Sequence, residues 1–227
     1  MSQGQTDITA GSPDSRRTAD PLSTRGRVYL AVCIVLIGLN LRTLFSSFSA
    51  ILPEITGATG MPAELVTALT TLPVLLLGLI APAAPPLARR FGTERIILAA
   101  MVVLAGGLAI RGTGNFGAMA AGTLACGAAI GIVNVLLPGL VKRDFQARLG
   151  LMSGLYTGAI CAAAALGAGF THPLLQASGS WQDALLFWAL PAAAVVLVFA
   201  PLAVRRRPAP DVLPGGGAVG VWRSPVA

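Results

Sequence analysis

Charged residues are scarce in this sequence. Only 11% of its 227 residues are Asp, Glu, Lys or Arg, whereas 55% are hydrophobic. Soluble domains carry about 25% charged residues, and their surfaces need polar groups to face water. A chain of this composition therefore has to place most of its length in lipid rather than in a soluble core.

The apolar segments of the sequence also lack acidic residues and histidine. Every Asp and Glu falls in a tail or between apolar segments, and His172 is the only histidine. A carboxylate proton relay, a paired-glutamate hydrolase, a zinc protease motif and a P-loop all need residues that these segments lack. Cys33, Cys126 and Cys161 stand alone, without the spacing of a disulfide framework or metal site. We therefore expect no enzyme activity, no cofactor and no metal.

What the sequence has instead is six apolar segments. Each is about long enough to cross a hydrocarbon layer of roughly 30 Å, which takes about 20 helical residues. The segments are 28–52, 65–83, 96–110, 116–141, 149–170 and 184–204. We predict an all-α integral membrane bundle of six helices. The third segment is short, so we expect its helix to start near Thr93 as an N-cap, with Arg95 and Arg111 snorkelling to the two interfaces.

The 16 Lys and Arg residues are unevenly distributed along the chain. If the amino terminus is cytoplasmic, 14 of them lie in cytoplasmic tails and loops, Arg111 lies in an outer loop, and Arg42 lies within a segment. Short loops rich in Lys and Arg are retained in the cytoplasm. We therefore expect a multi-pass protein of the cell (inner) membrane with both termini cytoplasmic. Topology and anionic lipid account for the positive charge, so nucleic-acid binding is not expected.

The two ends of the chain differ from its middle. Residues 1–27 are polar and lack the apolar core of a signal peptide, which predicts a disordered cytoplasmic tail. Residues 28–204 form the predicted transmembrane bundle. Residues 205–227 are rich in Pro and Gly and predict a cytoplasmic linker.

Arg42 is the strongest candidate for a ligand contact. It lies roughly 22 Å along the helix axis from Arg27, near mid-membrane, where an unpaired guanidinium costs several kcal/mol. Ser46 and Ser49 lie within about 60° of it on the helix surface and form one polar stripe. Facing a water-filled cavity, this stripe would attract a flat oxyanion such as a carboxylate. Facing other helices, the arginine would instead be held by backbone carbonyls for structure.

Asn134 and Tyr156 are weaker candidates. Asn134, midway in the fourth segment, can orient a polar solute or bridge two helices. Tyr156 can border a cavity in the fifth segment. In the same segment Gly150, Gly154 and Gly158 recur every fourth residue, which predicts a smooth face on which another helix packs closely.

Two other polar features are predicted to be structural. Asn40, Thr43 and Ser47 lie about opposite the arginine stripe and are expected to pack against other helices. His172 precedes Pro173 at the outer end of the fifth segment. We expect it to be an interfacial residue rather than a proton carrier.

The loop between the second and third segments, residues 85–95, resembles the cytoplasmic signature of the major facilitator superfamily, G-x-L-A-D-R-x-G-R-R/K. Pro85 stands in place of the glycine and Arg89 in place of the aspartate. The agreeing residues are Leu87, Ala88, Arg90 and Gly92. The resemblance implies a gating loop containing Arg90, Gly92 and Arg95, in which the missing acid removes the usual charge pair.

A further set of strings resembles the cyanate permease and nitroimidazole transporter family. The strings are Leu39-Asn40-Leu41-Arg42, Thr71-Leu72-Pro73-Val74, residues 131–138 (GIVNVLLP), residues 142–145 (KRDF) and residues 152–157 (MSGLYT). The chain departs from the family at Thr43, where proline usually follows the arginine. Members are twelve-span transporters made of two six-helix bundles, each of 3+3 inverted repeats. Their first and fourth helices line the cavity, which implies that Arg42 and Asn134 lie on the transport path.

Our leading hypothesis is a secondary transporter that moves a small anionic or polar organic solute by alternating access. Arg42 would anchor charge, with Ser46 beside it and with Asn134 and Tyr156 orienting the solute. The chain would be the amino-terminal half, with residues 220–227 resembling the lead-in to an absent seventh helix. A truncated reading frame is preferred to a six-helix protein active only as a homodimer. The alternative from another class is a non-transporting membrane remnant or scaffold.

Overall fold

The computed structural model describes residues 24–205, and every regular element within that range is a helix. The helices are α1 (Thr24–Leu41), α2 (Thr43–Ala50), α3 (Leu52–Thr59), α4 (Ala63–Ile80), the short 3-10 helix η1 (Ala81–Ala83), α5 (Ala84–Phe91), α6 (Thr93–Arg111), α7 (Phe116–Asp144), the 3-10 helix η2 (Gln146–Arg148), α8 (Leu149–Ser178), α9 (Trp181–Leu186) and α10 (Ala189–Arg205). The predicted tail up to residue 23 and the linker from residue 206 lie outside the described residues.

Six stretches of the described chain are long and apolar enough to cross a membrane. They are Thr24–Ala50, Ala63–Phe91, Thr93–Arg111, Phe116–Asp144, Gln146–Ser178 and Trp181–Val204. The six-helix prediction is confirmed, and all six spans are longer than the apolar segments from which they were predicted. The first helix starts at Thr24, within the tail that we predicted to end at residue 27.

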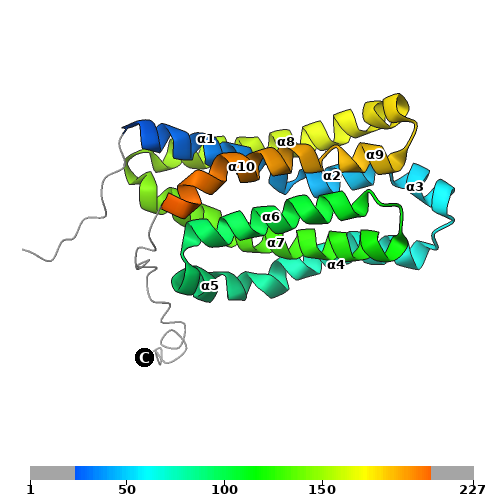
Figure 1. Cartoon of the computed structure of the whole chain (residues 1–227), viewed down its shortest axis with the longest axis horizontal. Coiled ribbons are helices and arrows are strands. Elements are labelled where there is room, and N and C mark those ends of the chain that lie inside the picture. The colour runs from blue at the N-terminus through cyan, green and yellow to red at the C-terminus, as the bar shows by residue number, and fades with distance from the viewer. Residues whose placement is uncertain (1–23, 206–227) are drawn as a thin grey trace, which may run out of the picture.

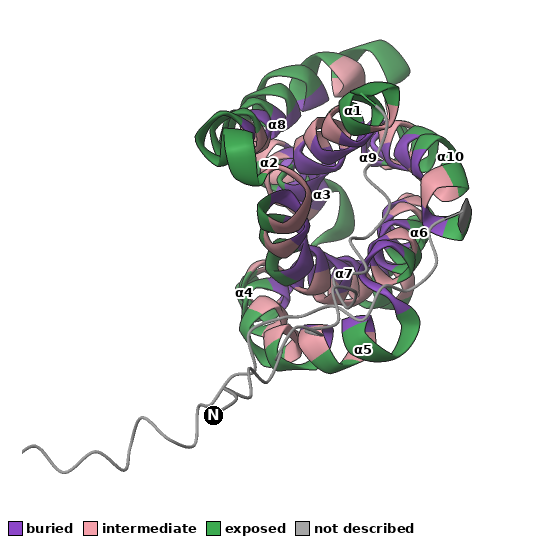
Figure 2. Cartoon of the chain, turned by 90° about the vertical axis from the view of Figure 1, so that its left-hand side faces the viewer, coloured by how far each residue is buried: buried purple, intermediate pink, exposed green. Residues whose placement is uncertain are grey.

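The spans lie side by side along the long axis of the molecule (Figure 1). The first span, α1 and α2, packs against α8, whereas α4 packs against α7 and α6 packs against both α7 and α10. Viewed along the bundle, purple buried residues face the middle and green exposed residues face outward (Figure 2). Each helix therefore turns one side to its neighbours and leaves another side open.

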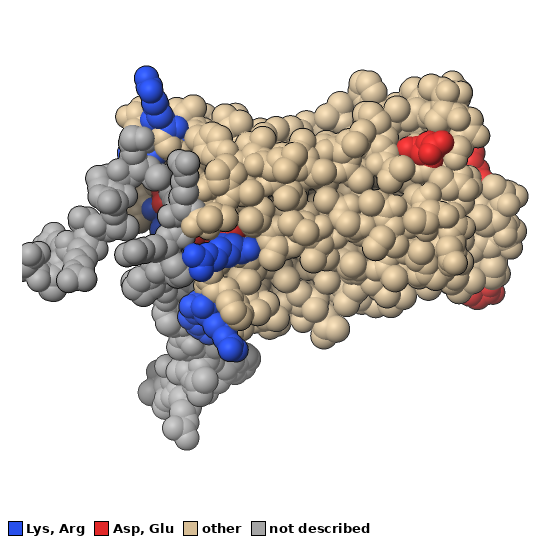
Figure 3. Space-filling model, viewed as in Figure 1, with Lys and Arg blue, Asp and Glu red and all other residues tan. Residues whose placement is uncertain are grey.

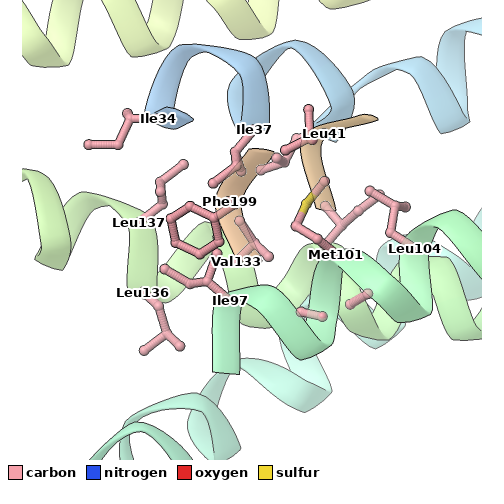
Figure 4. Packing of buried hydrophobic residues seen from close by; sticks show 14 of the residues in the cluster. Ile34, Ile37, Leu41, Ile97, Met101, Leu104, Val133, Leu136, Leu137 and Phe199 are labelled. Carbon is pink, nitrogen blue, oxygen red and sulfur yellow. The ribbon is translucent and has the colours of Figure 1, made fainter. Parts of the chain in front are cut away.

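Figure 4 shows how the interior of the bundle is filled. Phe199 of α10 lies among Ile37 of α1, Ile97 of α6 and Leu137 of α7, and all four are completely buried. Lipid tails are as apolar as these side chains, so close packing rather than exclusion of water holds the helices together. Glycine permits the closest approach: a Cβ added at Gly127 of α7 would lie 2.9 Å from the Cα of Pro73 in α4.

Charge separates the two ends of the bundle (Figure 3). At one end, here called the basic end, lie the first turn of α1, the α5–α6 region and the α7–α8 connection. Its Lys and Arg residues with described side chains are Arg25, Arg27, Arg89, Arg90, Arg95, Lys142, Arg143 and Arg148. The opposite, acidic end carries Glu54, Glu64 and Asp183. This is the asymmetry from which the orientation was predicted, and the orientation itself stays a prediction.

Two predictions for the third span were wrong. The side chain of Arg111 does not snorkel to the interface: the residue is 1% exposed, and its guanidinium carbon lies 5.0 Å from the centre of the Phe48 ring. Gly122 makes this inward path possible, because any Cβ there would lie 2.9 Å from Cγ of Arg111. Thr93 is the first helical residue rather than the cap, which is Gly92. Arg95 is exposed at the basic end.

Candidate functional site

The first span is interrupted at Arg42. Helix α1 ends at Leu41 and α2 begins at Thr43, while Arg42 itself has φ −105° and ψ −15°. Its carbonyl oxygen accepts two hydrogen bonds from Ser46, from the backbone N–H at 3.2 Å and from Oγ at 3.1 Å. Thr43 Oγ1 donates to the carbonyl of Asn40 at 2.9 Å. Hydroxyl groups that bond back to the preceding turn loosen and bend helices, so the side chains of this segment favour the interruption.

The Arg42 side chain is exposed on the surface of the bundle, whereas its neighbours Leu41, Thr43 and Leu44 are buried. No hydrogen bond or ion pair joins its guanidinium to another residue in the range 24–205. The structure therefore gives no support to the reading in which helix carbonyls hold this arginine. Five N–H donors stand free at the middle of a membrane span, where a bare charge is costly.

The other three predicted site residues, Ser46, Tyr156 and Asn134, lie on three different spans. Ser46 is half-buried, its hydroxyl is engaged with the Arg42 carbonyl, and its Cβ lies against Gly167 of α8. Tyr156 of α8 is half-buried, with its ring next to Gly38, one helical turn before Arg42. Asn134 of α7 is exposed, and no hydrogen bond among the described residues links it to either one. The structure thus groups Arg42, Ser46 and Tyr156 on two packed spans and leaves Asn134 on a third.

The glycine row of α8 borders an open groove of about 630 Å³. Val35 and Leu39 of α1 form one wall, and Gly150, Gly154 and Gly158 belong to the other. A Cβ added at any of these glycines would meet no atom within 4 Å. The smooth face predicted from the sequence is therefore present and uncovered by the described residues. Its lining is almost entirely apolar, as a seat for another helix would be.

At the basic end, the predicted gating loop contains the end of α5 and the start of α6. Gly92 takes φ +91°, a conformation that favours glycine, and its N–H caps α5 by donating to the Ala88 carbonyl at 2.8 Å. Arg90 is exposed, with its guanidinium carbon 5.2 Å from the centre of the Phe91 ring. Arg95 is also exposed. The loop therefore presents cations at the surface.

An acid does take part in a charge pair at this end, at a position that the sequence reasoning missed. Glu94 is 6% exposed and forms an ion pair with Arg143 of α7, which also contacts Asp144 at 3.1 Å. The pair joins the start of the third span to the end of the fourth. The signal was present in the sequence, because Glu94 lies in the signature loop and Arg143 lies in the string KRDF.

Two further ionisable groups, His172 and Arg111, lie towards the acidic end. His172 of α8 is exposed, as expected of an interfacial residue, and its Nε2 lies 3.5 Å from Oε1 of Glu54 in α3. Arg111 is buried, and its Nε and Nη1 atoms have no hydrogen-bond partner among the described residues. Neither contact was predicted, because each joins residues far apart in the sequence.

Comparison with known proteins places the chain in a family. The family model described as Major Facilitator Superfamily matches residues 30–226, which is most of the chain. This confirms the resemblance drawn from the signature loop and the family strings.

Curated relatives agree with that match. The 2-nitroimidazole transporter of Escherichia coli (strain K12) is 37% identical over 209 residues, which cover 91% of this chain and 53% of the relative. The cyanate transport protein CynX of the same strain is 36% identical over 172 residues, 75% of this chain and 44% of that protein. The uncharacterized transporter YycB of Bacillus subtilis (strain 168) is 35% identical over 174 residues, 76% of this chain and 43% of that protein. The chain spans about half the length of the relatives it matches.

Proposed function

Because the chain belongs to the major facilitator superfamily, we propose that it forms the amino-terminal half of a secondary transporter that moves a small anionic or polar organic solute by alternating access. The observation that carries the proposal is the free guanidinium of Arg42, exposed at the interruption of the first span. Names of relatives supply the solute class, since one is named for 2-nitroimidazole and one for cyanate.

Arg42 is the charge anchor in this proposal. A guanidinium fork binds flat oxyanions through two parallel hydrogen bonds, and it does so strongly where water is scarce. The bonds from Ser46 and Thr43 fix the backbone on both sides of Arg42. Fixed flanks lessen the entropy that the arginine loses when it meets the solute. Tyr156 and Asn134 are the orienting groups, each with one polar end and no charge.

A second six-helix bundle completes the transporter. It would cover the groove beside α8 and the face that bears Arg42, so that the arginine lines a cavity between two halves rather than facing lipid. The chain spans 53% of the nitroimidazole transporter, and the remainder of such a relative is long enough for a second bundle. The basic end would face the cytoplasm.

The experiment is solute exchange in vesicles that contain the protein as its native gene expresses it, with cyanate and 2-nitroimidazole as probes. Exchange is independent of the direction of net transport. We expect Arg42→Gln to lower cyanate exchange roughly 10- to 100-fold, the loss of one charged hydrogen-bond pair. Arg42→Lys keeps the charge but places a single ammonium group where Arg42 presents several N–H donors, so its cyanate exchange should fall in between. Exchange of 2-nitroimidazole, measured at a mildly acidic pH at which the ring is neutral, should fall less.

Arg148→Gln is the matched control, because Arg148 is also exposed but lies at the basic end, away from Arg42. It should exchange both probes at the wild-type rate. Unchanged cyanate exchange in both Arg42 variants would refute the anchor role. A wild-type protein that exchanges none of a wide panel of small anions and nitroheterocycles would favour the scaffold alternative.

A further inference from the structure

Arg111 is a buried cation that the proposed transport function does not use. It is the last residue of α6, it is 1% exposed, and it makes no ion pair within the described residues. Its Nε and Nη1 atoms are buried without a hydrogen-bond partner. The one favourable contact that the structure records for the guanidinium is the ring of Phe48, at 5.0 Å.

The ring contact is too weak to balance this burial. A cation over an aromatic face is worth about 0.5–2 kcal/mol. Removing an ion from water without a partner costs several kcal/mol even after the protein relaxes. Arg111 therefore requires an acceptor, and no carboxylate among the described residues pairs with it.

A second unpartnered donor lies at the same level of the bundle. The backbone N of Arg111 would lie 3.4 Å from a Cβ on Gly122, so Arg111 is level with Gly122 and with Thr123, the next residue of α7. Thr123 is 4% exposed, and its Oγ1 has no hydrogen-bond partner. It shares a face of α7 with Met119, one turn away, which packs in the same cluster as Phe48. Thr123 therefore lies on the same face of α7 as a member of the cluster that contains Phe48, the ring against which the guanidinium lies.

We propose that Arg111 and Thr123 form a binding site for a small monovalent inorganic anion, of which chloride is the most abundant. Nε–H and Nη1–H of Arg111 and the hydroxyl of Thr123 would donate to it, and the anion would neutralise the guanidinium. Phe48, Met119 and Cys126 around the site are all at most 4% exposed, so the packed interior excludes an organic solute. The site differs from the Arg42 site, where the arginine is exposed.

The site lies close to the acidic end, because Arg111 is followed directly by the turn that leads to α7 at Phe116. The acidic end is therefore the nearer of the two ends for an anion that enters the site. Three acids lie at this end, Glu54, Glu64 and Asp183. An anion held there must be bound by the donors of the site itself rather than drawn by the field around it.

The first experiment measures thermal unfolding of the purified full chain, with sodium gluconate replaced stepwise by sodium chloride or sodium bromide at constant ionic strength. Trp181 belongs to the Phe48 cluster and provides a fluorescence signal for this end. We expect the Tm to rise by about 3–6 °C when the anion reaches roughly tenfold its dissociation constant. Arg111→Met keeps the length without the charge, and Thr123→Val keeps the shape without the hydroxyl. The Tm rise should vanish in the first and shrink in the second.

Arg148→Met is the control and should keep the full Tm rise, because Arg148 is an exposed arginine at the opposite end. If Arg111→Met fails to fold, bromide anomalous diffraction from the wild-type chain decides the matter, with a peak expected beside Arg111 between α2, α6 and α7. The proposal is overturned if gluconate and chloride give the same Tm, if Arg111→Met retains the rise, or if bromide gives no peak there. These outcomes do not bear on Arg42, whose variants are tested by solute exchange.

Discussion

At the residue scale, the buried carboxylate of Glu94 makes the ion pair with Arg143 sensitive to the loss of one partner. Glu94→Gln should destabilise the chain by about 1–3 kcal/mol, because the half-buried guanidinium of Arg143 then loses a charged acceptor. Thermal unfolding in detergent is the measurement. Glu64→Gln, at an exposed acid of the acidic end, is the control and should leave the Tm unchanged.

The same pair allows a stricter test. Arg143→Gln combined with Glu94→Gln removes both charges, so the double variant should be more stable than the sum of the two single losses implies. Additive losses would show that the two side chains do not interact in the folded chain.

The burial of a residue was predicted well where the face of its own helix decides it. It was predicted poorly where residues on other helices decide it. Asn40, Thr43 and Ser47 are buried, as their common face predicted. Arg111 was misplaced, because the space for its side chain is made by Gly122 on another helix and the ring it covers belongs to Phe48 on a third. No local pattern reports such a contact. The roles of Arg42, Asn134, Tyr156 and Ser46 stay predictions, although the structure leaves Arg42 exposed.

At the element scale, the glycines of α8 and α7 serve different contacts. Gly154→Leu adds a side chain where no described atom lies within 4 Å of the new Cβ, so the six-helix chain should keep its Tm. If a second bundle docks in the groove, the same change should reduce solute exchange severalfold through overpacking. Exchange at the wild-type rate would show that this groove is not the docking surface.

Gly127→Ala is the matched contrast within the bundle. Its new Cβ would lie 2.9 Å from the Cα of Pro73, so α4 and α7 must move apart. We expect a loss of about 1–3 kcal/mol in unfolding free energy, measured together with Gly154→Leu.

The number of spans could be predicted because apolar length alone decides it. The interruption at Arg42 could not be predicted from length, since the apolar segment runs through it without a break. Its cause is local, in the hydroxyl groups of Thr43 and Ser46 that bond to the turn before them. The density of Asn, Thr and Ser around Arg42 was the available signal.

At the scale of the whole molecule, the separation of charge predicts the orientation in the cell. In a Cys161→Ala background, which removes the exposed native thiol, Thr113→Cys places a thiol at the acidic end and Arg148→Cys places one at the basic end. A membrane-impermeant maleimide added to intact cells should label the first and not the second, because the basic end is retained in the cytoplasm. If only the Arg148→Cys variant were labelled, the orientation would be the reverse of the one proposed.

The charge of Arg42, at the interruption of the first span, also affects how the protein is inserted into the membrane. A central arginine opposes insertion of a helix by the translocon by about 2.5–3.5 kcal/mol, and this one sits in the first span, which must enter the membrane before any partner helix exists to shield it. Arg42→Leu would ease that step and raise the amount of protein in the membrane while removing the charge anchor. Yield and activity would then change in opposite directions, so a stabilised chain selected only for high expression would tend to lose the residue that we propose it needs for transport.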